Sequence, residues 1–96
     1  MTHKQIIRVS PGEVLLEEFL KPLGISQRRL AICTNLPVSR IADVVHDRRD
    51  ITPATAIRLA AAFETTPNFW MNMQTAWSLF KLQDEVLDVT PVYEGA

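Results

Sequence analysis

The chain has few of the residues that would identify an extracellular protein or a metalloprotein. Cys33 is the only cysteine among 96 residues, so no disulfide can form within the chain, and we expect it in the reducing cytoplasm. Its two histidines, His3 and His46, have no partner at metal-ligand spacing, and no HExxH stretch occurs. The sequence therefore predicts no metal site, no disulfide framework and no cofactor.

Glycine and long apolar runs are also scarce. The three glycines stand apart at positions 12, 24 and 95, which excludes a glycine-rich phosphate-binding loop. No run approaches the roughly twenty apolar residues that span a bilayer, and residues 1–9 lack the apolar stretch of a signal peptide. Cys33 is interpreted as a small buried hydrophobe, and Glu17 and Glu18 point to different sides of a helix. We therefore expect no enzyme activity, no small-molecule substrate and no membrane association.

Charge is unevenly distributed, although the formal net charge is only −1. Five arginines and two acids lie between Ser26 and Arg49, whereas residues 84–96 contain four acids and no base. Because counterion release depends on the charges that meet phosphates, a basic middle segment is compatible with DNA binding despite the negative sum.

Helix-start signals recur along the chain and predict an all-α fold. Ser-Pro or Thr-Pro pairs stand at 10–11, 52–53 and 66–67, where the hydroxyl caps a free amide and proline fits the first helical position. Glu13 completes a capping box with Ser10. Ser26 is a fourth helix start, with Ile25 and Leu30 spaced as a hydrophobic staple. Combined with the apolar spacing, these signals predict five helices. They lie at about Pro11–Lys21, Gln27–Thr34, Val38–His46, Pro53–Phe63 and Pro67–Gln83.

Three parts of unequal size follow from this pattern. We expect residues 1–9 to form an N-terminal arm, in which Ile6–Val9 is short and extended. Residues 10–83 would form a helix-turn-helix domain that ends in a dimerisation helix. Residues 84–96 would be an acidic tail that frays.

The second and third predicted helices are short and joined by about three residues, as in a DNA-reading helix-turn-helix. A helical wheel at about 100° per residue divides the third helix into an apolar and a polar side. The apolar side holds Ile41, Val44 and Val45, and the polar side holds Ser39, Asp43 and His46, flanked by Arg40 and Ala42. Such a helix grips its domain with one side and offers hydrogen-bonding groups to base edges with the other. Periodicity alone leaves a second interpretation open, that of two amphipathic helices with a solvated basic face.

The expected DNA contacts comprise base-edge contacts from the third helix and phosphate contacts from its surroundings. The start of the second helix, rich in free amides, would add another phosphate contact. The predicted DNA-binding residues are Gln27, Val38, Ser39, Arg40, Asp43, His46, Arg48 and Arg49.

Several stretches of the chain resemble known families. The stretches SQRRLA at 26–31, VSRI at 38–41 and RRDIT at 48–52 resemble the phage-repressor (Xre/Cro) type of helix-turn-helix. The stretches SPGEVLLEEFLKPLG at 10–24, TPATAIRLA at 52–60 and TPNFWMNMQ at 66–74 resemble the HigA/VapI antitoxin family. This resemblance covers about residues 10–82. It implies a five-helix, phage-repressor-like fold and a dimeric repressor of its own operon that neutralises a RelE-like, mRNA-cleaving toxin.

The chain departs from the family pattern at two turns. Asn35 stands where the family usually has glycine, and His46-Asp47 stands where it usually has Asn-Gly. Asn and Asp tolerate a positive φ, so we expect the fold to persist. Asp43 on the polar side would repel phosphates but could accept a hydrogen bond from a cytosine amino group. No operator sequence follows from such residues.

The fifth predicted helix is apolar on several sides, which suggests a second buried face and hence a homodimer. The predicted dimerisation residues are Trp70, Trp77, Leu79, Phe80 and Leu82. The expected partners are therefore double-stranded operator DNA, a cognate RelE-like toxin and a second copy of the chain. Two alternatives remain: a stand-alone Xre-type transcriptional regulator without a toxin, and a helical protein-interaction domain that has lost DNA binding.

Overall fold

The structure, a computed structural model, describes residues 9–83, 85 and 88–93. Three segments follow one another without a break and form what we call the first helix: α2 (Pro11–Val14), η1 (Leu15–Leu20) and α3 (Lys21–Leu23). The remaining helices are α4 (Gln27–Thr34), α5 (Val38–Val45), α6 (Pro53–Phe63) and α7 (Pro67–Leu82). The prediction of an all-α fold with five helices is confirmed, and no strand occurs in the ranges that the structure describes.

The first helix differs from its prediction in length and in hydrogen bonding. It was expected to end near Lys21, but it continues through Pro22 to Leu23 and ends at Gly24, whose φ is +66°. Its middle part is a π-helix, in which the amide of Lys21 donates to the carbonyl of Leu16, five residues earlier. Pro22 has no amide hydrogen, and its ring crowds the carbonyl four residues before it. A locally widened helix accommodates that proline without ending.

Side-chain caps begin the helices where the sequence predicts them. A hydroxyl accepts a hydrogen bond from the amide three residues later at four helix starts. The capping residues are Ser10, Ser26, Thr52 and Thr66, with oxygen-to-nitrogen distances of 3.1, 3.0, 3.4 and 3.1 Å. Each cap satisfies an amide that would otherwise lack a partner.

A single apolar core joins all five helices. Its fully buried members include Leu15, Ile41, Leu59 and Trp70. The Trp70 indole lies 5.0 Å from the Phe19 ring, centroid to centroid, and its Nε1 donates to Thr65 Oγ1 at 2.8 Å. The sequence placed Trp70 on a dimer surface. Because Trp70 is 0% exposed, that assignment is wrong.

Cys33 is also placed differently from its prediction. The inward side of α4 is formed by Leu30, Ala31 and Thr34, which leaves Cys33 on the exposed side. The small apolar character of cysteine suggested burial, but the rotation of α4 about its axis decides the question.

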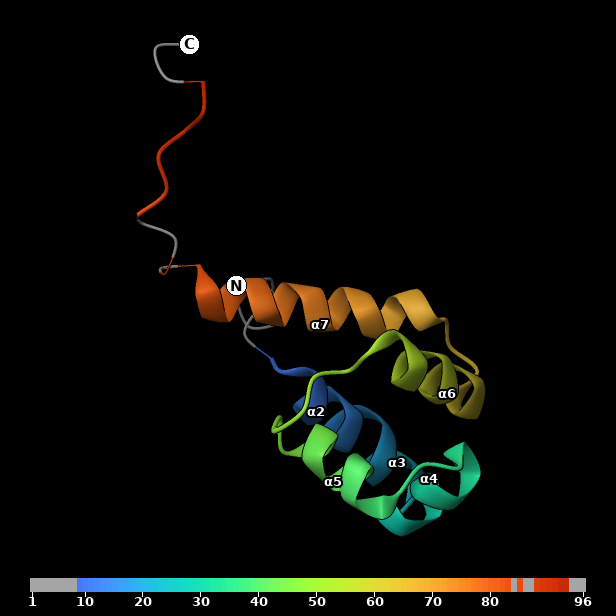
Figure 1. Ribbon diagram of the computed structural model, residues 1–96. Coiled ribbons are helices and arrows are strands. Elements are labelled where there is room, and N and C mark those ends of the chain that lie inside the picture. The colour runs from blue at the N-terminus through green and yellow to red at the C-terminus, as the bar shows by residue number, and fades with distance from the viewer. Residues whose placement is uncertain (1–8, 84, 86–87, 94–96) are drawn as a thin grey trace.

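Helix α7 lies across one side of the domain, over α6 at one end and over α2 towards the other (Figure 1). The expected arm at 1–9 falls outside the described residues except for Val9, which is not helical. Within 84–96, the described residues 88–93 form no helix and are exposed. No helix in the described part of the chain is long and apolar enough to cross a membrane.

Candidate nucleic-acid interface

Helices α4 and α5 pack together across a turn formed by residues 35–37. Asn35 adopts the left-handed conformation, with φ 58°, as its position in the turn predicted. The Leu36 amide donates to the Ala31 carbonyl at 3.1 Å, and Arg58 Nη1 from α6 donates to the Thr34 carbonyl at 2.9 Å. Because a cation at a helix C-terminus is favourable, Arg58 fixes the end of α4 just before the turn.

The two sides of α5 are divided as the helical wheel predicts. Ile41, Val44 and Val45 are buried, with exposures of 1%, 1% and 6%. The opposite side carries the polar residues: Ser39 and His46 are exposed, and Asp43 is half-buried. We call the surface formed by Val38, Ser39, Asp43 and His46 the reading side of α5. It has the composition that a helix in a major groove requires.

Basic and amide groups surround the reading side. Gln27 is half-buried at the first position of α4, where free amides point outward. Arg28 and Arg29 follow it and are exposed, whereas Arg40 is half-buried on α5. Arg49 is exposed in the segment after α5, which we call the 46–52 loop. These groups could contact phosphates on either side of a groove that α5 enters.

Arg48 is held by Asp43 of the reading side. Its Nη2 lies 3.0 Å and its Nε 3.1 Å from the same carboxylate oxygen, Oδ1. The pair offsets the negative charge that the sequence placed on the reading side. It also engages one edge of the guanidinium, so a phosphate contact by Arg48 would have to use the other edge or break this pair.

His46 folds back onto the end of α5. Its Nδ1 lies 2.9 Å from the Ala42 carbonyl oxygen. A carbonyl can only accept, so Nδ1 carries the hydrogen of this bond. In the neutral ring, Nε2 is then an acceptor. Such an acceptor suits an exocyclic amino group of a base better than it suits a phosphate.

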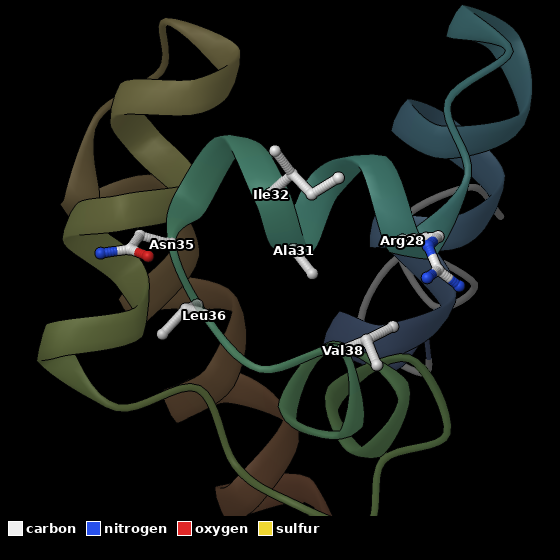
Figure 2. A pocket seen from close by; sticks show the side chains of 6 residues that line it. All are labelled: Arg28, Ala31, Ile32, Asn35, Leu36 and Val38. Carbon is white, nitrogen blue, oxygen red and sulfur yellow. The ribbon is translucent and has the colours of Figure 1, made fainter.

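A shallow groove opens beside the start of α5 (Figure 2). Its volume is about 410 Å³, and it is lined by Arg28, Ala31, Ile32, Asn35, Leu36 and Val38. Ile32 is 74% exposed and Val38 is 50% exposed. The sequence placed Val38 at the interface but gave Ile32 no role. The groove joins an apolar patch to the reading side.

The 46–52 loop is fixed at both ends. At its start, Asp47 has φ 57° and accepts hydrogen bonds from Ser10 Oγ at 2.5 Å and from the Gly12 amide at 3.1 Å. At its far end, the buried Ile51 amide donates to Gln74 Oε1 of α7 at 2.8 Å. The sequence predicted the positive φ at Asp47 but not these contacts. They join segments far apart in the chain, and no periodicity or spacing signals them.

The C-terminal half of α7 carries the remaining predicted dimerisation residues. Leu79 and Leu82 are 65% and 52% exposed. Trp77 and Phe80 are half-buried, and their rings stack with centroids 5.7 Å apart. Leu79 and Phe80 also line a second open groove, of about 460 Å³, together with Ala76 and Gln83. In the described part of the chain, the buried Nε1 of Trp77 has no hydrogen-bond acceptor.

No metal site is evident at this interface or elsewhere in the described ranges, where no three histidine, cysteine or acidic side chains come together.

Comparison with known proteins agrees with this geometry. A family model described as Helix-turn-helix matches residues 16–70. Virulence-associated protein I of Dichelobacter nodosus is 45% identical over 71 residues, which are 74% of this chain and 66% of that protein. Antitoxin HigA-1 of Vibrio cholerae is 36% identical over 89 residues, which are 88% of this chain and 84% of that protein. The chain thus spans just under two thirds of the first of these relatives.

One solved structure is similar to this chain over nearly the whole length of that structure. The antitoxin HigA of Pseudomonas aeruginosa, solved with the higBA promoter, has a TM-score of 0.79 and 31% identity, covering 88% of this chain and 98% of that one. The family match includes all of α4, α5 and α6, the helices that form and support the reading side. The chain therefore belongs to the phage-repressor-like (Xre) helix-turn-helix family of DNA-binding regulators, which includes the HigA antitoxins.

Proposed function

We propose that this protein is the antitoxin of a type II toxin–antitoxin module. It represses its own operon by binding operator DNA, and it neutralises a RelE-like, mRNA-cleaving toxin. The observation that carries the DNA-binding part is the reading side of α5, a polar surface on a helix whose opposite side is buried, with arginines on its flanks. The likeness to the HigA antitoxins supports the toxin-binding part.

The residues around the reading side divide by role. Val38, Ser39 and His46 face base edges, and Asp43 does so together with its partner Arg48. Gln27, Arg40 and Arg49 contact phosphates, because they lie beside the reading side rather than on it. Phosphate contacts fix the register of α5 in the groove, and base contacts select the sequence.

A homodimer places two reading sides on one operator. One recognition helix covers only a few base pairs, and a single small module rarely reaches operator affinity. Trp77, Leu79, Phe80 and Leu82 of α7 form the proposed dimer surface. Under a two-fold axis, the operator is an inverted repeat with half-sites about one helical turn apart, roughly 34 Å or ten base pairs.

The test has two arms. In the first, the purified protein is titrated against DNA from its own promoter and against a scrambled fragment of the same length at one salt concentration. We expect a clear preference for the promoter, and equal affinities would overturn the DNA-binding part. In the second, the protein is co-expressed with the adjacent open reading frame. Co-purification and rescue of growth support the antitoxin. A promoter-specific protein that neither binds nor rescues would be a stand-alone regulator instead.

A further inference from the structure

Asp47, in the 46–52 loop just after the C-terminal end of α5, binds the N-terminus of the first helix. Its two carboxylate oxygens accept from different donors, Oδ2 from Ser10 Oγ at 2.5 Å and Oδ1 from the Gly12 amide at 3.1 Å. Ser10 is 5% exposed, and the amides at a helix start carry a partial positive charge. The carboxylate thus acts as an anion bound at the start of the first helix, although it comes from a residue 35 positions away.

The same two helix ends also touch through their backbones. A Cβ atom on Gly12 would lie 2.3 Å from the Val44 carbonyl oxygen and 2.4 Å from that of Val45. Both carbonyls belong to the last turn of α5, where the partial charge is negative. The positive start of the first helix therefore meets the negative end of α5 directly, and Asp47 spans the junction.

We propose that Asp47 is a positioning residue for DNA reading. It anchors the C-terminal end of α5 to the first helix and thereby sets the angle at which the reading side meets the base edges. This inference rests on the proposed DNA-binding function and deepens it. Asp47 acts through the orientation of α5, since both of its carboxylate oxygens are engaged by Ser10 and Gly12.

The removal of Asp47 should lower operator affinity if Asp47 positions α5, and should raise it if Asp47 is only a surface charge. Asp47 is one residue away from Arg48, on a surface that approaches phosphates. Were it only a surface charge, its removal would strengthen binding to every DNA sequence, because one repulsion disappears. If it positions α5, its removal weakens binding to the operator and leaves binding to unrelated DNA unchanged or stronger.

The variant Asp47→Gly separates the anchor from backbone strain, because glycine adopts the φ of 57° without steric cost. We expect its operator affinity to fall about tenfold, the effect of one mismatched base pair. Its affinity for a scrambled fragment stays the same or rises. Asp50→Asn is the matched control, since it removes the same charge from the same loop at an exposed residue. That control should strengthen binding to both fragments.

Two further variants guard against a general loss of structure. Asp47→Asn keeps the side-chain shape if the glycine variant folds poorly, and it should shift the ratio of affinities in the same direction. Phe63→Leu removes core packing at the end of α6, where the rings of Phe63 and Phe19 lie 4.9 Å apart, centroid to centroid. It should leave the ratio unchanged. A ratio that falls equally in Phe63→Leu would overturn the proposal, as would Asp47 variants that behave like Asp50→Asn.

A coupling test addresses the partner directly. Ser10→Ala should lower operator affinity in the wild-type background and have a smaller effect in the Asp47→Gly background, because the contact is already absent. Equal effects in both backgrounds would show that Ser10 acts without Asp47. A wild-type protein without preference for its promoter would instead remove the proposed function and this inference with it.

Discussion

A carboxylate on a surface that approaches phosphates carries an electrostatic cost, and Arg48 offsets that cost for Asp43. Nη2 and Nε of Arg48 lie 3.0 and 3.1 Å from Oδ1 of Asp43. Both side chains are partly exposed, that of Asp43 by 34% and that of Arg48 by 58%. An exposed pair adds little to folding stability. On the proposed DNA-binding surface, we expect the pair to present a donor edge and an acceptor oxygen to the groove. A separate arginine would attract phosphates, and a separate aspartate would repel them.

Arg48→Ala should therefore weaken operator binding mainly by leaving Asp43 uncompensated. The double variant Asp43→Asn/Arg48→Ala should recover most of the lost affinity. Arg49→Ala is the comparison, because Arg49 is a proposed phosphate contact. It should reduce the slope of log affinity against log salt by about 0.9, and Asp43→Asn should not restore it. Titrations over a range of salt measure both effects. Strictly additive losses at Asp43 and Arg48 would show that Arg48 acts alone.

Val38 is the one large apolar side chain on the reading side, and it is 50% exposed. The thymine methyl group is the apolar feature of the major groove, so we predict that Val38 contacts a thymine of the operator. Replacing that thymine by uracil removes only the methyl group and should cost about 0.8 kcal/mol of binding free energy. Val38→Ala should make binding insensitive to the replacement.

Ile32→Ala is the control for that contact. Ile32 lines the same groove as Val38 (Figure 2) but belongs to α4, so its truncation should leave the uracil effect in place. Uracil scanning at every thymine of the operator would refute the prediction if no position responds differently in Val38→Ala.

At the scale of the element, the two sides of α5 have different roles: one packs in the core, and the other is proposed to contact bases. Val44 is 1% exposed, so Val44→Ala should cost about 1–3 kcal/mol of unfolding free energy through lost packing. Ser39 is exposed, so Ser39→Ala should change operator preference and leave that free energy nearly unchanged. Denaturant titrations monitored by circular dichroism give the first quantity and binding assays the second. An unaltered denaturation midpoint in Val44→Ala would mean that this side of α5 is not packed as described.

Helices could be predicted from the sequence where their signals lie within a few neighbouring residues. The hydroxyl caps and the apolar period of α5 depend on residues within one turn of each other, and both predictions are confirmed. The first helix was predicted too short, because a proline usually ends a helix and the π-helical widening before Pro22 leaves no mark in the residue pattern. Cys33 was misplaced because its apolar character was weighed above its angular position on α4.

At the scale of the whole molecule, the exposed leucines of α7 require an explanation that one small core does not provide. Leu79→Glu should convert the proposed dimer to a monomer while leaving the fold intact, since Leu79 is already 65% exposed and a charge there opposes burial in an interface. Ile57→Glu is a matched control, because Ile57 of α6 is 58% exposed and lies outside the proposed surface. Sedimentation reports the oligomeric state of each variant.

The same variants test the link between dimer and operator. Leu79→Glu should lose protection of the second half-site in footprinting, whereas Ile57→Glu should protect both. A wild-type chain that remains monomeric at about 100 times the concentration needed for operator binding, yet protects two half-sites, would contradict a preformed dimer. DNA would then assemble the pair.

Contacts between distant segments were beyond the reach of the sequence. The hydrogen bonds from the Gly12 amide to Asp47 and from the Ile51 amide to Gln74 join residues 35 and 23 positions apart, and only the folded chain brings them together. Trp70 illustrates the same limit. Its position in the sequence predicts that it lies on the same side of the helix as Trp77. However, the crossing of α7 over α6 places Trp70 in the core and leaves the far end of the helix outside it (Figure 1).

Gly12 has a consequence for how this sequence can change over time. Its φ is not positive, so its backbone conformation does not itself require glycine. A side chain there would instead collide with the carbonyls of Val44 and Val45. A library that samples every amino acid at each position, selected for operator repression, should retain glycine alone at 12 while accepting many residues at the exposed neighbour Glu13. Sequencing the survivors would check this. Related sequences can therefore differ on the reading side and recognise different promoters. A residue other than glycine at position 12, however, would require the first helix and α5 to move apart.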